Sequence, residues 1–204
     1  VLVHHYSDNI LHDSSQYGHI GNDSEGAAAK KQNGIINSCI GVDESDDTTV
    51  NIYDWDDPVD FSSAMTAEMW VYIDPSTTET SGRLMTNGPG YSTNDWCWYM
   101  RPGNNNAEFD VHLNGGLELR EGNLPGNDGE SFWWYTAMRW DDASNDLRVY
   151  QNYTEEGAES TTTTIANSYN TLTIGNDGGG GNTWDGYIDE VRISKIQRSV
   201  DWID

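Results

Sequence analysis

The sequence has few cysteines, few basic side chains and no long apolar run. Its 204 residues include two cysteines, Cys39 and Cys97, with no C-x-x-C pair and no cluster of cysteine and histidine, so no zinc site is expected. Whether the two cysteines form a disulfide stays open here, because a sequence does not give the distance between them. No apolar stretch approaches the roughly 20 residues that cross a bilayer, so we expect no insertion into a membrane.

Charge of one sign dominates the chain. It carries 34 acidic and 10 basic residues, a formal net charge of −24. Binding of nucleic acid requires a basic stripe that neutralises phosphates, so we expect no nucleic-acid partner, and anionic membranes are disfavoured for the same reason. An acidic surface attracts cations and keeps a protein soluble at high salt. That suits a saline habitat, a cation-rich assembly or solubility alone.

The length fits one domain, and we expect a single domain over residues 1–204. The chain starts at Val1 without Met or a signal peptide, which favours a processed product or an excised domain. Two N-x-S/T sequons occur, at Asn22 and Asn152. They are weak signals, because sequons arise by chance and bacteria rarely use them.

Short strands separated by turns are the main pattern. The chain has 21 Gly, 9 Trp and 11 Tyr, and this many aromatic residues excludes a disordered tail. Ala67, Met69 and Val71 alternate with Glu68 and two aromatic residues, which is the period of a strand. Regular short strands with turn signals predict a β-sandwich. The pattern predicts strands at 34–42, 50–53, 65–73, 83–87, 96–101, 107–113, 132–140, 147–152, 161–166, 171–174 and 186–194.

Three segments resemble a known family. They are TLTIGNDGGGGNTWDGYIDEVRISKIQRSVDWID at 171–204, the hairpin FWWYTAMRWDDASNDLRVYQN at 132–152 and the strand MTAEMWVYI at 65–73. Each is similar to an element of the laminin-G-like jelly rolls in the concanavalin A-like lectin/glucanase superfamily. The resemblance implies an all-β, antiparallel two-sheet jelly-roll sandwich.

The same resemblance implies a function in recognition. It indicates a non-catalytic module that lies outside the cell, at a cell surface or at a virion surface, with a carbohydrate or cell-surface glycan as its partner. The alternative is a structural subunit of a filament, capsid or cell surface that contacts copies of itself or other subunits. Fold alone does not decide between them.

Asp189 is the candidate metal ligand. On the strand at 186–194 the alternation places it on one face with two β-branched apolar residues, Val191 and Ile193, where an unpaired carboxylate is costly. Ca²⁺ is bound by carboxylate and carbonyl oxygens and would remove that cost. In relatives the matching Asp helps to bind a structural Ca²⁺, so the resemblance implies Ca²⁺ held by Asp189 with Asp13 or Asp8. The alternative is that Asp189 caps backbone amides or pairs with Arg192 or Lys195.

The strand at 107–113 carries the candidate catalytic groups. Glu108, Asp110 and His112 share one face of that strand. Retaining glycosidases use two carboxyl groups about 5 Å apart, and the glucanases of the superfamily carry E-x-D-x-(x)-E on one strand. His112 stands where the second Glu belongs, so a glycoside hydrolase or lyase is the less favoured alternative.

Exposed aromatic rings are the candidate ligand-binding groups, because a pyranose has an apolar face and a rim of hydroxyl groups. Trp70 and one of Trp133 and Trp134 match apolar family positions and are expected in the core. The Gly-rich loop at 176–182 is expected to form a recognition rim. The candidate ligand-binding residues are Trp184, Trp55, Tyr91, Trp96 and Trp98.

Overall fold

The computed structural model shows a protein built almost entirely from strands. It describes residues 2–5, 14, 15, 18–24, 32–43, 45, 49–53, 63–74, 82–88, 96–101, 107–113, 116–124, 132–161, 163, 171–177 and 182–203. The elements are β1 (Leu2–His4), β2 (Gly21–Ser24), β3 (Gln32–Asn33), β4 (Ser38–Val42), β5 (Thr49–Tyr53), β6 (Ala64–Ile73), β7 (Gly82–Asn87), β8 (Trp96–Arg101), β9 (Ala107–Leu113), β10 (Gly116–Leu124), β11 (Trp133–Asp141), β12 (Asp146–Gln151), β13 (Thr154–Ser160), β14 (Thr171–Ile174), β15 (Gly186–Ser194) and α1 (Val200–Ile203).

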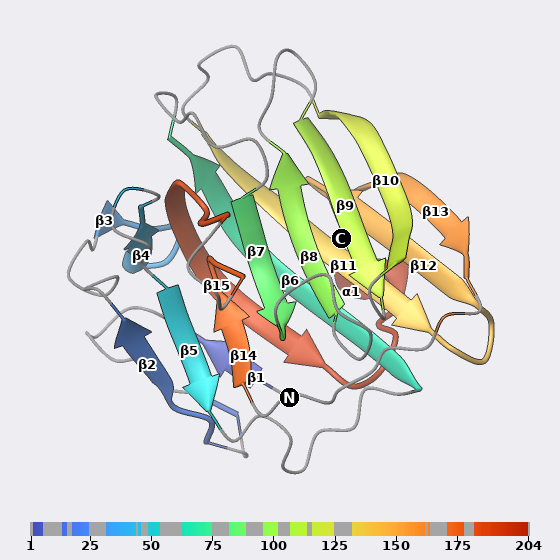
Figure 1. Cartoon of the computed structure of the whole chain (residues 1–204), viewed down its shortest axis with the longest axis horizontal. Helices are drawn as coiled ribbons and strands as arrows, with labels where there is room; N and C mark the ends of the chain where they lie inside the picture. The colour runs from blue at the N-terminus through green and yellow to red at the C-terminus, as the bar shows by residue number, and fades with distance from the viewer. Residues whose placement is uncertain are drawn as a thin grey trace.

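The strands form two antiparallel sheets, sheet A and sheet B. Sheet B lies in front of sheet A in Figure 1. Sheet A has the order β13-β12-β11-β6-β15-β4-β3, and β1 also pairs with β15. Sheet B has the order β10-β9-β8-β7-β14-β5-β2. The chain passes repeatedly between the sheets, as in β6 to β7 and β14 to β15. The predicted two-sheet jelly-roll sandwich is confirmed.

The space between the sheets is filled by apolar side chains from alternate strand positions. On β6, Met65, Ala67, Met69 and Val71 are fully buried in this core, and the residues between them lie on the outer face of sheet A. Burying a large apolar side chain contributes about 1.5–3 kcal/mol. The core therefore fixes which side chains of sheet A point outward.

A β-bulge interrupts β15. Its register with β6 shifts between Asp189 and Arg192, and Glu190 has a φ of 51°. Before the bulge β15 pairs with β4, and after it with β1. Because a bulge inserts one extra residue, Ile188 shares the core with Val191, while Asp189 lies opposite an outward residue of β6. The expectation that Asp189 shares a face with Val191 is therefore wrong.

Both cysteines are buried, and neither is part of a disulfide. Cys39 lies on β4 of sheet A and Cys97 on β8 of sheet B. The disulfide that the sequence leaves open is therefore not formed in this structure.

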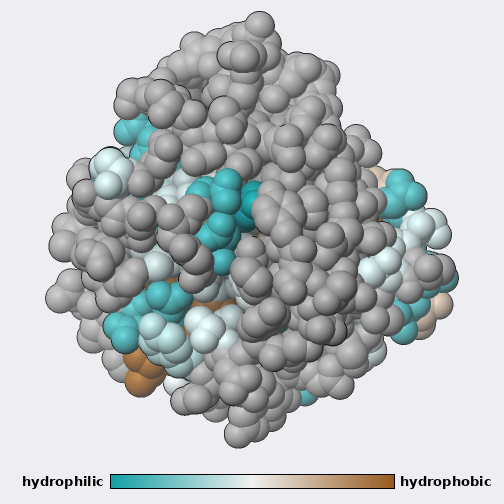
Figure 2. All heavy atoms as spheres, viewed as in Figure 1, coloured by the Kyte–Doolittle hydropathy of each residue, from teal (hydrophilic) through white to brown (hydrophobic). Residues whose placement is uncertain are grey.

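The surface on the side of sheet B shows mostly hydrophilic and neutral colours among the described residues, with a small hydrophobic area at the lower left of Figure 2. Within the described part of the chain, no helix has the length and apolar character needed to cross a membrane. Large exposed apolar side chains include Ile196, Val200 and Trp202 in the C-terminal segment.

Candidate functional site

Three aromatic side chains form a row across the outer face of sheet A. Trp133 on β11, Tyr72 on β6 and Tyr187 on β15 occupy directly opposed positions in the strand register. The centroid of the Tyr72 ring lies 5.8 Å from that of Trp133 and 5.4 Å from that of Tyr187, with ring planes 58° and 45° apart. The centroids of Trp133 and Tyr187 are themselves 6.5 Å apart, so the three rings lean together into a compact triangle over this row of strand positions. All three side chains are half-buried. Their neighbours hold the rings in place while part of each surface stays accessible.

The row ends in a hollow between β15 and β4. The residue opposite Tyr187 on β4 is Gly41, which has no side chain and leaves the flank of the Tyr187 ring uncovered. The hollow has a volume of about 210 Å³. Its lining residues are Gly41, Val42, Asp43, Asp74, Asp185, Gly186 and Tyr187. An aromatic ring and several carboxylates therefore face the same small space.

Negative charge surrounds the Tyr187 phenol. Asp74 follows β6 and Asp185 precedes β15, and the Asp74 N–H donates a hydrogen bond of 3.0 Å to the Asp185 carbonyl. Burial and then the charge of Asp74 raise the pKa of Tyr187 above its ordinary value. The phenol therefore keeps its proton at neutral pH and can donate a hydrogen bond. The surrounding charge favours neutral or cationic ligands over anionic ones.

A second aromatic group lies two residues further along the same strands. Tyr135 on β11 is opposite Trp70 on β6, with ring centroids 5.6 Å apart. Tyr153, from the turn between β12 and β13, stacks on Tyr135 at 4.9 Å and meets Trp70 edge-on at 6.5 Å. The Tyr153 side chain is 45% exposed. The outer face of sheet A thus carries two adjoining aromatic groups.

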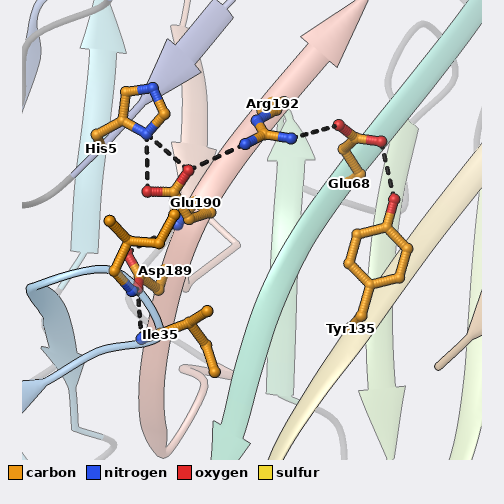
Figure 3. A network of polar contacts seen from close by, with 8 residues as sticks. His5, Ile35, Glu68, Tyr135, Asp189, Glu190 and Arg192 are labelled. Carbon is orange, nitrogen blue, oxygen red and sulfur yellow. Dashed lines mark hydrogen bonds and ion pairs between the residues drawn. The ribbon is translucent and has the colours of Figure 1, made fainter. Parts of the chain in front are cut away.

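A chain of polar contacts crosses the same face (Figure 3). His5 Nδ1 lies 2.6 Å from the Glu190 carboxylate. The Arg192 guanidinium lies 3.1 Å from Glu190 and 3.4 Å from Glu68, and the Tyr135 hydroxyl donates a hydrogen bond of 2.9 Å to Glu68. Both glutamates are almost fully buried, and one guanidinium compensates both charges. The network links the residue after β1 to β15, β6 and β11, and it includes Tyr135 of the second aromatic group.

The Asp189 carboxylate caps backbone amides, as one alternative from the sequence predicts. Its Oδ2 accepts hydrogen bonds from the N–H groups of Ile35 at 2.8 Å and Ile36 at 3.1 Å, and its Oδ1 accepts from the N–H of Glu190 at 2.9 Å. Figure 3 shows Asp189 turned toward this loop. Burial raises the pKa of the Asp189 carboxyl, and the amide donors oppose that rise. The side chain fastens the turn at 34–37 to β15.

The Ca²⁺ site stays a prediction. Asp8 and Asp13 lie outside the described residues. Among the residues that the structure describes, no group of three or more His, Cys, Asp or Glu side chains is placed to hold a metal ion. The Asp189 side chain is fully buried and accepts three amide hydrogen bonds.

Three of the expected ligand-binding tryptophans lie in the core. Trp96 and Trp98 are 0% exposed and Trp184 is 1% exposed. The two β8 side chains belong to the apolar cluster between the sheets, and the absence of a side chain at Gly82 leaves room for the Trp184 ring. The expectation that these rings are exposed is wrong. Trp55 and Tyr91 lie outside the described residues, as do residues 178–181 of the Gly-rich loop.

The outward aromatic residues were not identified from the sequence. Trp134 is 2% exposed and belongs to the core, whereas Trp133 lies on the outer face. Trp70 also lies on the outer face and is half-buried, so its expected place in the core is wrong. The available signal was a large aromatic residue at outward positions of three strands, and only the register brings Tyr72 and Tyr187 beside Trp133.

Comparison with protein families gives a match over most of the chain. The family model Laminin_G_3, described as Concanavalin A-like lectin/glucanases superfamily, matches residues 44–204. No curated protein matches the chain.

Comparison with solved structures gives the same fold at low sequence identity. Domain 4 of AbnA, a GH43 extracellular arabinanase from Geobacillus stearothermophilus in complex with arabinotriose, is 15% identical with a TM-score of 0.72, over 99% of this chain and 95% of that one. The binding domain of botulinum neurotoxin DC in complex with rat synaptotagmin II is 14% identical with a TM-score of 0.72, over 100% of this chain and 49% of that one. A botulinum neurotoxin type C structure, from work on its interaction with two ganglioside molecules, is 14% identical with a TM-score of 0.71, over 100% and 49%. The chain spans about half of each toxin domain, and at these identities the likeness shows the fold alone.

Proposed function

Because this chain belongs to the concanavalin A-like lectin/glucanase superfamily, we propose that it is a non-catalytic recognition module that binds carbohydrate outside the cell. The observation that carries the proposal is the row of Trp133, Tyr72 and Tyr187, which leads into the carboxylate-lined hollow. Aromatic faces pack against the C–H face of a sugar ring. The carboxylates accept hydrogen bonds from sugar hydroxyl groups, and the Tyr187 phenol donates one.

The geometry of the row favours a particular shape of ligand. Its rings are half-buried, so little side-chain freedom is lost when a ligand binds. The planes of the three rings differ from one another by 58°, 45° and 39°, so they do not form one flat platform. This supports binding of a single glycan chain in preference to a flat crystalline polysaccharide.

The relatives support a glycan partner at the level of the fold. The arabinanase domain is in complex with arabinotriose, and the type C toxin interacts with two ganglioside molecules. Their binding residues are not transferred to this chain, because the identities are 15% and 14%. The carboxylates around Tyr187 favour neutral glycans over acidic ones.

The test is binding to a glycan array, followed by titration calorimetry on the glycans that bind. Trp133→Ala and Tyr187→Ala should each weaken binding by about tenfold or more, since an aromatic contact is worth about 0.5–1.5 kcal/mol beyond its buried area. The matched control is Tyr53→Ala, because Tyr53 is 52% exposed on β5 of the other sheet. If the wild type binds neither neutral nor acidic glycans on the array, the proposal is contradicted.

An assembly role is the second candidate function. It is favoured by three apolar side chains near the C-terminus, Ile196, Val200 and Trp202, which are 50%, 43% and 52% exposed. Exposed apolar side chains within a short segment suit a contact surface, and the Arg198 guanidinium lies 4.1 Å from the centre of the Trp202 ring. This candidate would be favoured if the wild type self-associates in light scattering, Trp202→Ser does not, and the wild type binds no glycan.

The catalytic alternative rests on Glu108, Asp110 and His112 of β9, which lies in sheet B and not beside the aromatic row. It stays the less favoured prediction. Hydrolysis of β-glucans by the wild type that is lost in Glu108→Gln would establish it and overturn the non-catalytic proposal.

A further inference from the structure

We infer that Tyr153 extends the aromatic row into a second subsite, so that the face takes an internal stretch of a linear glycan rather than a single terminal sugar. This inference rests on the proposed function and specifies its ligand. Three features of Tyr153 carry it: its backbone conformation, its attachment to β11 and its position relative to the row.

Tyr153 has a backbone conformation that its residue type disfavours. Gln151 pairs with Thr154, so Asn152 and Tyr153 form a two-residue hairpin turn, with φ of 43° and 70°. Such type I′ turns favour Asn at the first position and Gly at the second. A bulky residue in the left-handed region is a genuine outlier, and strain of this kind clusters at ligand-binding sites.

The strained residue is only partly used in packing. Its ring contacts Tyr135 and Trp70, yet the side chain stays 45% exposed, so part of the ring faces solvent. A Gly at this position would remove the strain and leave the turn type unchanged. The presence of a tyrosine here therefore points to a role for its exposed ring.

Hydrogen bonds hold the Asn152–Tyr153 turn against β11 and so fix the position of the Tyr153 ring. The Asn152 N–H donates a hydrogen bond of 2.9 Å to the Tyr135 carbonyl, and the Asn152 Oδ1 accepts one of 3.1 Å from the Tyr135 N–H. The Tyr153 ring stacks on the Tyr135 ring with planes 22° apart. The Tyr135 hydroxyl is itself held by Glu68. A ring fixed in this way costs little conformational freedom on binding.

Tyr153 lies beside the row, against Tyr135 and Trp70 of the second aromatic group. Tyr135 and Trp133 are two residues apart on β11, so their side chains leave the same face of the sheet about 6.8 Å apart. The strand that carries Tyr187, β15, and the strand that precedes the Tyr153 turn, β12, are separated by β6 and β11, which places the two strands about 14 Å apart at the usual spacing. One sugar ring does not span this distance, but a short run of linked rings does.

The experiment compares oligosaccharide lengths. Wild type, Tyr153→Gly and Tyr153→Phe are titrated with neutral linear arabino-, xylo-, cello- and manno-oligosaccharides, from disaccharides to hexasaccharides. The protein is made in a bacterial host, because Asn152-Tyr153-Thr154 reads as an N-glycosylation sequon. Wild-type affinity is expected to rise with chain length in the series that binds. Tyr153→Gly should bind the longest oligosaccharide about tenfold more weakly than the wild type does, and its affinity should depend less on oligosaccharide length. Tyr153→Phe should keep the wild-type dependence of affinity on length.

Thermal unfolding supplies a second measurement. Tyr153→Gly should unfold at the same temperature as the wild type or higher, because relief of strain offsets the lost ring contacts. A fall of several degrees would show that the ring serves packing and would overturn the inference. An unchanged dependence on length in Tyr153→Gly, with binding still lost in Trp133→Ala, would overturn the inference and leave the proposed function intact. If no oligosaccharide binds the wild type, the proposed function falls and the inference with it.

Discussion

The Tyr135 hydroxyl donates a hydrogen bond of 2.9 Å to the buried carboxylate of Glu68, across the neighbouring strands β11 and β6. Burial, reinforced by the Glu68 charge, raises the pKa of Tyr135, so the phenol stays a donor across the physiological range. The bond therefore fixes the ring on which Tyr153 stacks, and it compensates a carboxylate whose other described partner is Arg192 at 3.4 Å.

Removing this hydroxyl should destabilise the protein. Tyr135→Phe keeps the ring but leaves Glu68 without its closest donor, and a hydrogen bond to a charged group is worth about 1.5–3 kcal/mol. We expect a loss of that size in the free energy of unfolding measured with urea. Tyr53→Phe, at an exposed position of β5, is the control. A loss no greater than about 0.5 kcal/mol, the range of ordinary surface changes, would show that water replaces the hydroxyl.

Gly186 lines the hollow, and its replacement should destabilise the protein. Its φ is 149°, and a Cβ at this position would collide with the backbone carbonyl of Tyr72. We expect Gly186→Ala to lower the free energy of unfolding by more than about 3 kcal/mol, because backbone strain and a steric clash add. Gly18→Ala is the matched control, since Gly18 also has a positive φ, 67°, but a Cβ there would meet nothing within 4 Å. That control should cost about 1 kcal/mol, and equal losses in the two variants would contradict the role assigned to the clash.

Most strands could be predicted from the sequence. The bounds of β8, β9, β14 and β15 coincide with the predicted ranges, because alternation and aromatic runs end at clear turn residues there. The match with an established family strengthened the prediction of the sandwich itself.

The strand β13 shows where the pattern fails. Both ends of the strand are exposed and only Gly157 is buried, so the strand carries no apolar alternation. Its pairing with β12 makes it a strand. Glu155, Glu156 and Glu159 suit the edge of a sheet, where charge opposes pairing with another chain. The pattern predicts a strand at 161–166 instead, and the described residues Thr161 and Thr163 lie outside any strand.

The aromatic face depends on register, which the sequence does not contain. Trp133, Tyr72 and Tyr187 are far apart along the chain, and a shift of one residue would move each side chain to the opposite face. The bulge at Glu190 adds a second obstacle, because it breaks the alternation from which the faces of β15 are inferred. Neither a shared strand face, as for Trp96 and Trp98, nor a place in a loop, as for Trp184, reveals exposure, and all three of these side chains are buried.

The Ca²⁺ prediction leads to a stability measurement. If Asp189 holds Ca²⁺ together with Asp13 or Asp8, the ion binds the folded state alone and must raise the free energy of unfolding. The gain is about 2.7 kcal/mol when Ca²⁺ is at one hundred times its dissociation constant. We expect the unfolding midpoint to fall on addition of EDTA and to recover with excess Ca²⁺, and Asp189→Asn to lose this response. A midpoint that is the same with EDTA and with Ca²⁺ would contradict the site.

The buried Asp189 carboxyl should also give the protein a distinct dependence on pH, measured in EDTA to exclude any cation. Its pKa is raised in the folded state, with burial as the largest cause. The folded state therefore binds more protons than the unfolded state at pH values above the ordinary Asp pKa, which is about 3.9. The free energy of unfolding must then fall as pH rises from that value until it passes the folded-state pKa. We expect the free energy of unfolding of the wild type to fall relative to that of Asp189→Asn over this window, and the difference between the two to stay constant at higher pH.

Asp201→Asn, at an exposed position of α1, is the control for general charge effects. A wild-type advantage that grew with pH would mean that the amides of Ile35, Ile36 and Glu190 outweigh burial.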